Sequence, residues 1–183
     1  MGSSADSPDK IARFEATVLP HIDAAYNLAR WMTRNSSDGE DVAQEAILRA
    51  FRFFDTFRGE DGRVWLLTIV RNTYLTWVRR QLPQHNSAEF DEHQHTDIEA
   101  VLTPEAQVLR QATAEQVRGA IAMLPPEYRE VILMREFEQM SYKEIAAVTQ
   151  SPLGTVMSRL SRARSMLRQL IGGERRMEAS HHG

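Results

Sequence analysis

Apolar residues in the last third of the chain recur with the period of a helix. The spacings are four, three, four and three residues along Val156, Leu160, Ala163, Leu167 and Leu170, which predicts one buried stripe. The other faces of this helix carry hydroxyl and guanidinium groups without an acidic residue: Thr155, Ser158, Arg159, Ser161, Arg162, Arg164, Ser165 and Arg168. The pattern therefore predicts an amphipathic helix with a basic outer surface.

A second, shorter helix is predicted directly before this one. Ser141 and Glu144 have the spacing of a capping box, and Tyr142 and Ile145 begin its apolar face. Turn residues at 151–154 then separate the two helices. This order is typical of a helix-turn-helix that places its second helix in the DNA major groove. The alternative is a solvated basic surface helix, but the acids at i and i+4 that usually accompany exposed arginine are missing.

The first part of the chain is also expected to be helical. Pro20 suits the first turn of a helix that runs to about Thr33. After a loop, Ser37 and Glu40 have the spacing of a second capping box, which predicts a helix to about residue 54. A long helix is predicted from about residue 63 to 80, after a loop with two glycines.

The helix that begins near Glu40 has two faces of different character. Its expected core stripe consists of Val42, Ala43, Ala46, Ala50 and Phe53. The other side carries Asp41, Gln44, Glu45, Leu48 and Phe51. An exposed Leu and Phe among acids and an amide would form a docking face for another protein. Packing of both residues under a neighbouring helix of the same domain explains them equally well.

The helix over residues 63–80 raises a similar question. Its apolar face is expected to be Leu67, Val70, Tyr74, Trp77 and Val78, opposite Trp65, Thr68, Ile69, Asn72, Thr76 and Arg79. An aromatic ring, an amide, hydroxyls and a guanidinium on one face can stack on unpaired bases and bond to them. In the alternative, Trp65 and Ile69 are core residues of a helix that is buried on two sides.

Composition divides the chain into two helical domains. The net charge is -3, yet six acidic residues and no Lys or Arg lie between residues 83 and 105. We therefore expect an all-α protein with domains at residues 10–82 and 105–172, joined by an acidic flexible linker at 83–104. The absence of cysteine excludes disulfides and thiolate metal sites. No apolar run is long enough to span a membrane and no signal peptide is recognised, so a cytoplasmic protein is expected.

Two sets of motifs resemble a known family. Residues 41–46 (DVAQEA), 57–59 (FRG) and 65–72 (WLLTIVRN) look like sigma region 2. Residues 124–129 (LPPEYR), 141–146 (SYKEIA) and 154–164 (GTVMSRLSRAR) look like sigma region 4. In this order the two sets resemble the extracytoplasmic-function sigma factors of bacteria. The resemblance implies a transcription initiation factor without catalytic activity, cofactor or metal.

The resemblance also implies partners and residues for each face. Asp41, Gln44, Glu45, Leu48 and Phe51 would bind the clamp helices of the largest subunit of RNA polymerase. The minus-10 promoter element would be held by Arg58, Arg63, Trp65, Arg71, Asn72, Thr76, Arg79 and Arg80. The minus-35 duplex would be read by Thr155, Met157, Ser158, Arg159, Ser161, Arg162, Ser165 and Arg168. The flap of the second-largest subunit and an anti-sigma factor are further expected partners, and the latter could hold the protein at the membrane without direct insertion.

Departures and alternatives remain. Gly62 stands where many members of the family have an aromatic residue, and Met157 where some have Arg. A stand-alone regulator that uses only the helix-turn-helix, with the first domain as a sensor, is one alternative. A metal-responsive module on Asp91, His93, His95 and Asp97 is another, since carboxylates flanking His-x-His can bind Zn or Ni.

Overall fold

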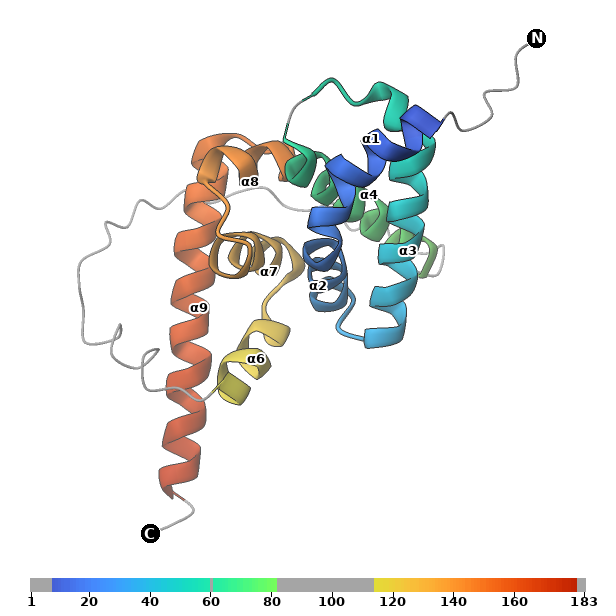
Figure 1. Ribbon diagram of the computed structural model, residues 1–183. Coiled ribbons are helices and arrows are strands. Elements are labelled where there is room, and N and C mark those ends of the chain that lie inside the picture. The colour runs from blue at the N-terminus through green and yellow to red at the C-terminus, as the bar shows by residue number, and fades with distance from the viewer. Residues whose placement is uncertain (1–7, 60, 82–113, 181–183) are drawn as a thin grey trace. The chain divides into compact units, whose positions relative to one another are not determined.

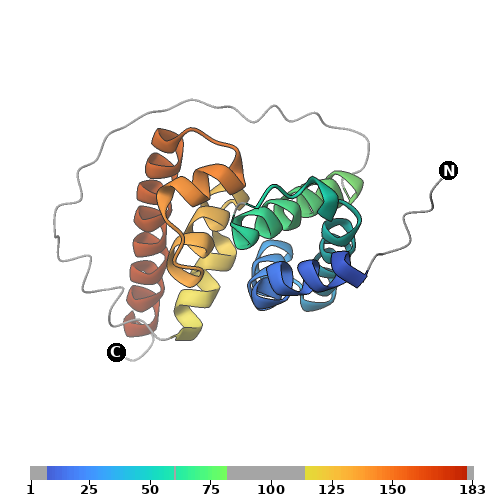
Figure 2. The ribbon, with the colours of Figure 1, turned by 45° about the horizontal axis from the view of Figure 1, so that its top comes forward.

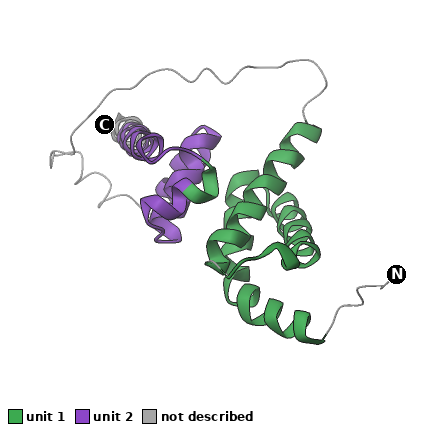
Figure 3. Cartoon of the chain, turned by 90° about the horizontal axis from the view of Figure 1, so that it is seen from above, with its two compact units in different colours: residues 1–88, 147–150 green, residues 89–146, 151–183 purple. Residues whose placement is uncertain are grey.

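The computed structural model describes residues 8–59, 61–81 and 114–180 (Figure 1). Helices and short turns make up this part of the chain, and it contains no strand, which confirms the all-α prediction. The described helices form two compact units (Figure 3): residues 8–81 belong to the first, and the helices after residue 114, apart from residues 147–150, belong to the second. The predicted linker at 83–104 and the alternative metal module at residues 91–97 lie outside the described residues. The predicted domain boundaries stay predictions.

The N-terminal unit is a set of antiparallel and crossing helices (Figure 2). Its elements are α1 (Pro8–Val18), the 3₁₀ turn η1 (Leu19–His21), α2 (Ile22–Thr33), α3 (Ser36–Arg52), the 3₁₀ turn η2 (Phe54–Thr56) and α4 (Gly62–Gln81). The helices α2, α3 and α4 pack against one another, and α1 lies against α4. The predicted end of α2 at Thr33 is correct, and both predicted ends of α4 are correct to within one residue. Pro20 lies in η1 rather than in the first turn of α2, which begins at Ile22.

The start of α3 differs from the prediction. Asn35, not Ser37, is the N-cap, and its side-chain oxygen accepts hydrogen bonds from the backbone N–H groups of Ser37 and Asp38 at 2.8 and 3.3 Å. Ser37 already lies in the first turn. Glu40 accepts a hydrogen bond from Arg30 of α2 at 2.7 Å instead of closing a capping box. This carboxylate therefore ties α3 to α2.

The core stripe of α3 is confirmed at four of its five positions. Val42, Ala43, Ala46 and Ala50 are buried, but Phe53 is 53% exposed. Phe54 takes its place, with 1% of its surface exposed. The reason is that α3 ends at Arg52, so Phe53 is its C-cap and Phe54 begins the 3₁₀ turn η2, where the α-helical period does not apply.

Two glycines allow the helices of this unit to approach closely. A Cβ on Gly39 would lie 2.5 Å from the Cα of Arg30, so α2 and α3 cross with backbone against backbone. A Cβ on Gly62, the first residue of α4, would lie 2.6 Å from the carbonyl oxygen of Thr17. Neither position has room for a side chain unless the helices move apart.

The buried face of α4 contains predicted and unpredicted residues. Leu67, Val70 and Tyr74 are buried as expected, whereas Trp77 and Val78 are only half-buried. Leu66 and Thr73 are buried in addition. The hydroxyl of Thr73 donates to the carbonyl of Ile69 at 2.8 Å, and this bond satisfies a polar group in the core.

The C-terminal unit contains the predicted helix-turn-helix. Its elements are α6 (Ala114–Met123), α7 (Pro126–Ile132), the π-helical turn η3 (Leu133–Phe137), α8 (Tyr142–Thr149) and α9 (Leu153–Ser180). Both α6 and α7 pack along α9 (Figure 1). The capping box before α8 is confirmed: the N–H of Ser141 donates to Glu144 at 2.6 Å, and the N–H of Glu144 donates to the Ser141 hydroxyl at 3.2 Å.

The long helix α9 is confirmed, with different ends. It begins at Leu153, two residues before the predicted start, and continues to Ser180. Val156, Leu160, Ala163 and Leu167 are buried as predicted, whereas Leu170 is half-buried and Ile171 takes its place in the core. The turn before α9 is shorter than expected because Leu153 and Gly154 are already helical, and the N–H of Val156 donates to the carbonyl of Pro152 at 3.1 Å.

A buried arginine closes the corner between α6 and α7. Arg129 is 3% exposed, and its guanidinium donates to the carbonyls of Ile121, Ala122 and Leu124 at 3.3, 3.1 and 2.7 Å. These carbonyls lie at the end of α6, where a helix leaves acceptors without partners of its own. The arginine therefore stabilises the unit that supports α9.

Candidate polymerase and nucleic-acid interfaces

The predicted docking face on α3 divides into exposed and packed residues. Asp41, Gln44 and Glu45 are exposed, and Leu48 exposes 62% of its surface. Phe51 is half-buried and packs edge-on against Phe14 of α1, with ring centroids 5.1 Å apart. Packing within the domain therefore accounts for Phe51 but not for Leu48.

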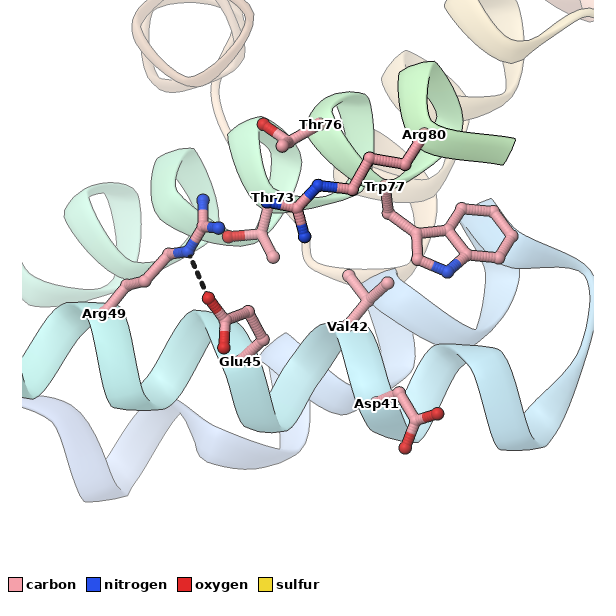
Figure 4. Close-up of a pocket in the computed structure, with 8 residues that line it drawn as sticks. All are labelled: Asp41, Val42, Glu45, Arg49, Thr73, Thr76, Trp77 and Arg80. Carbon is pink, nitrogen blue, oxygen red and sulfur yellow. Dashed lines mark hydrogen bonds and ion pairs between the residues drawn. The ribbon is translucent and has the colours of Figure 1, made fainter. Parts of the chain in front are cut away.

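A groove between α3 and α4 brings two of the predicted sites together (Figure 4). It is lined by Asp41, Val42, Glu45 and Arg49 of α3 and by Thr73, Thr76, Trp77 and Arg80 of α4. Asp41 and Glu45 belong to the predicted polymerase face, and Thr76 and Arg80 to the predicted minus-10 face. Its volume of about 240 Å³ is below the usual range for small-molecule sites.

Charges along this groove are already paired in part. Glu45 accepts a hydrogen bond from Arg49 at 2.7 Å, drawn as a dashed line in Figure 4. Arg49 and Trp77 lie toward opposite ends of the groove, and the side chain of Arg80 extends along α4 toward Thr73. Trp77 was expected on the apolar face of α4, but it is half-buried, and its ring stacks on Tyr74 with centroids 6.2 Å apart.

An aromatic cluster holds the loop before α4. Trp65 lies 5.2 Å from Phe57 and 6.0 Å from Phe54 between ring centroids. Trp65 is half-buried, so it is part of the packing of the unit and still presents some surface to solvent. Phe57 thus fixes one end of the loop, while Arg58 and Gly59 are exposed. Gly59 has a φ of 81°, a conformation that favours glycine.

The other end of this loop is fixed by a cap. The Asp61 carboxylate accepts hydrogen bonds from the N–H groups of Arg63 and Val64 at 2.8 and 3.3 Å. Gly62 follows this cap and lies against Thr17, so the aromatic residue that many members of the family have here does not fit this backbone. The departure at Gly62 therefore has a packing reason.

The predicted minus-10 residues on α4 are accessible to different degrees. Asn72, Arg79 and Arg80 are exposed, and Arg63, Arg71 and Thr76 are half-buried. The hydroxyl of Thr76 donates to the carbonyl of Asn72 at 2.9 Å, which leaves its oxygen as an acceptor for a ligand.

On α9 the predicted minus-35 residues fall into two groups. Met157 is 51% exposed, and a half-buried group comprises Thr155, Ser158, Arg159, Ser161, Arg162, Ser165 and Arg168. Arg159 donates to the Ser151 hydroxyl at 3.3 Å and lies 4.0 Å from the carboxylate of Glu130, which is buried in α7. The Ser158 hydroxyl donates to the carbonyl of Thr155 at 3.0 Å. The side chain of Arg159 is therefore held within the helix-turn-helix.

Arg164 has an acidic partner that local spacing did not reveal. Its guanidinium donates to Glu136 at 2.9 Å, from 28 residues earlier in the chain, and hydrogen-bonds Tyr142. Burial acts to lower the pKa of Arg164, but the hydrogen bonds to Glu136 and Tyr142 outweigh it and raise the pKa above its ordinary value. The basic surface of α9 is therefore smaller than its sequence suggests.

Comparison with known proteins identifies the family. The model of Sigma-70 region 2 matches residues 17–82, and the model of Sigma-70 region 4 matches residues 114–167. The RNA polymerase sigma-H factor of Pseudomonas aeruginosa is 35% identical over 162 residues, covering 84% of this chain and 83% of its own. The chain belongs to the extracytoplasmic-function sigma factors. The sigma-E factor of Haemophilus influenzae is 36% identical over 151 residues, 79% of each chain.

A solved structure agrees on the fold of this sigma factor. RpoE of Bartonella quintana, crystallised with the anti-sigma factor NepR, matches with a TM-score of 0.68 and 24% identity over 87% of this chain and 97% of its own. The two family matches contain all the predicted site residues except Arg168, which follows the region 4 match directly. The expected family, all-α fold and function as an RNA polymerase sigma factor are confirmed. The roles of individual residues stay predictions.

No helix in the described part of the chain is long and apolar enough to cross a membrane.

Proposed function

We propose that this sigma factor binds core RNA polymerase through the exposed face of α3 and positions it at promoters through α4 and α9. The observation that carries the proposal is Leu48, a large apolar side chain left 62% exposed between acidic and amide groups. Its own unit packs Phe51 and leaves Leu48 to solvent, so an external partner is the better explanation for it.

In this proposal α4 and the loop before it capture one strand of the minus-10 element. Trp65 offers part of a ring, Asn72 offers an exposed amide, and Arg58, Arg79 and Arg80 offer exposed cations for the backbone. Stacking and cationic contacts of this kind bind single strands. Extrusion of a base from the duplex costs a few kcal/mol, which such contacts would offset.

The helix α9 reads the minus-35 duplex in the same proposal. Its arrangement after α8 and a short turn supports this, since the second helix of a helix-turn-helix enters the major groove. Two DNA contacts, each weak alone, would act together once polymerase holds both units at promoter spacing, because the second contact then forms at a high effective concentration.

Control by an anti-sigma factor belongs to the proposal as well. The sigma factor RpoE of Bartonella quintana, whose fold this chain shares, was crystallised with an anti-sigma factor. A partner of this kind would compete with polymerase for the face around Leu48. The protein would act in the cytoplasm, where polymerase and promoters are found, and it would be held at the membrane only through such a partner.

Run-off transcription tests the proposal directly. Core polymerase is mixed with the full chain and a library of random promoters, and the transcribed templates are sequenced. We expect transcription that depends on the sigma factor and enriches two separated sequence elements. Tight binding of duplex DNA by the protein alone, without any gain in transcription, would instead favour a stand-alone regulator.

A further inference from the structure

The first two turns of α9 present an apolar surface to solvent. Leu153 and Met157 lie one helical turn apart and are 43% and 51% exposed. Gly154 lies beside them and has no atom within 4 Å of the position that a Cβ would occupy, so this end of the helix is open. The two side chains together form a small exposed apolar surface at the start of a helix that is otherwise basic.

Hydrogen-bonding groups near this tip are partly occupied. The guanidinium of Arg159 is bonded to Ser151 and lies close to Glu130, while the hydroxyl of Ser158 donates to a backbone carbonyl of its own helix. Farther along, Arg164 is bonded to Glu136. The groups of the first two turns that reach outward most are therefore the side chains of Leu153 and Met157.

Charge favours duplex DNA as the partner of this surface. Between residues 153 and 172 there are four arginines, Arg159, Arg162, Arg164 and Arg168, and no acidic residue. Arg159 and Arg164 have acidic partners on earlier elements, but the helix itself adds no negative charge that would oppose phosphate. Such a helix is suited to lie between phosphate backbones. Within the major groove, the residues near the start of a recognition helix meet the base edges, and thymine is the base whose edge carries a methyl group.

We propose that Met157, supported by Leu153, contacts the 5-methyl group of a thymine in the minus-35 element. The inference rests on the proposed function of α9 as the reader of that element. The thioether side chain of methionine is flexible and polarizable, so it can adapt to a methyl group in the groove. An arginine at this position would favour guanine, since the guanidinium bonds to its O6 and N7 atoms. This factor thus differs in base preference from members of the family that have Arg at the position of Met157.

Replacement of thymine by uracil tests the contact, because uracil lacks only the methyl group. A minus-35 element is first obtained from the promoter library with core polymerase and the full chain. Each thymine of the element is then replaced singly by deoxyuridine, and binding of the holoenzyme is measured. We expect one or two positions at which loss of the methyl group weakens binding by about fourfold, the effect of one buried carbon group.

Variants assign the effect to the side chain. Met157→Ala should bind thymine and uracil templates equally at that position, whereas Met157→Leu should keep most of the difference. Gln169→Ala changes an exposed residue of the same helix and should keep all of it. Met157→Arg should shift the selected base from thymine toward guanine. Thermal unfolding of each variant checks that the unit remains folded.

Three results would overturn the inference. If the holoenzyme transcribes from selected promoters but uracil binds as well as thymine at every minus-35 position, the methyl contact is absent and the proposed function still stands. The same conclusion follows if Met157→Ala retains the full difference between thymine and uracil. Failure to transcribe any template of the library would overturn the proposed function together with this inference.

Discussion

Leu48→Asp should prevent association of this sigma factor with core polymerase while leaving its fold intact. The residue is 62% exposed on α3, so in the unbound protein the new carboxylate stays hydrated and the helix is preserved. In the complex the same carboxylate would be buried without a partner. A single substitution therefore separates binding from folding.

The exposed fraction of Leu48 determines how much binding free energy its substitution should remove. Full burial of a leucine side chain contributes about 1.5–3 kcal/mol, so covering the remaining 62% contributes about 1–2 kcal/mol. Leu48→Ala should thus weaken the complex by about 5- to 30-fold. Leu48→Asp adds the cost of burying an unpaired charge, several kcal/mol, and should weaken it by more than about a hundredfold.

Fluorescence anisotropy of the labelled protein, titrated with core polymerase, measures the affinity, and circular dichroism checks the helix content. Leu19→Asp is the matched control, because Leu19 is 49% exposed in η1 of the same unit but outside the predicted face. It should bind polymerase like the unmodified protein. Unchanged affinity of Leu48→Asp, or an equal loss in Leu19→Asp, would refute the assignment of the face on α3.

Gly39→Ala should lower the stability of the N-terminal unit by about 1–3 kcal/mol, because the new Cβ would meet the backbone of α2 at 2.5 Å. Gly119→Ala, at a position on α6 with room for a Cβ, should instead stabilise its unit by about 0.5–1 kcal/mol. Hydrogen exchange resolved by unit measures the change in unfolding free energy for both variants. Changes of the same sign would contradict the packing argument. Arg162→Ala should lower the discrimination between bases at one or two minus-35 positions by about 1–3 kcal/mol of binding free energy. Arg159→Ala loses bonds within the helix-turn-helix, so it should weaken binding to all promoter sequences alike. Binding to a promoter library distinguishes them, and uniform losses from both would mean that neither reads bases. Asn72→Ala should spare polymerase binding but impair opening of duplex promoters, as permanganate footprinting detects; an equal defect on a template already mismatched at the minus-10 element would indicate a structural role instead.

Two capping boxes with the same spacing had different outcomes. At Ser141 the box forms, because no other capping residue precedes it directly. Near Ser37 the chain offers Asn35 earlier, and Asn35 takes the cap once Arg34, with a φ of 61°, has ended α2. Local spacing predicts that a helix begins, but it cannot choose among several neighbouring caps.

The periodicity of α9 predicts its buried residues, but it does not predict contacts with residues distant in the sequence. The buried stripe followed from periodicity and is confirmed through Leu167. The acidic partners of its arginines could not be found in this way, since Glu136 lies 28 residues before Arg164 and Glu130 lies on α7. The same limit applies to Phe51, whose partner Phe14 comes from α1. Rules about i and i+4 neighbours describe contacts within one helix, so they cannot predict partners on other helices.

Phe57 and Asp61, which flank the loop before α4, are both anchored by contacts within the unit. The ring of Phe57 packs at a tilt against Trp65, with centroids 5.2 Å apart, and Asp61 caps the helix that follows. Residues anchored in this way lose little conformational freedom when a ligand binds them, so the entropic cost of ordering them is low. Strand capture at this loop would then depend mainly on the stacking and hydrogen bonds that a base gains there. The temperature dependence of strand capture should therefore reflect those contacts.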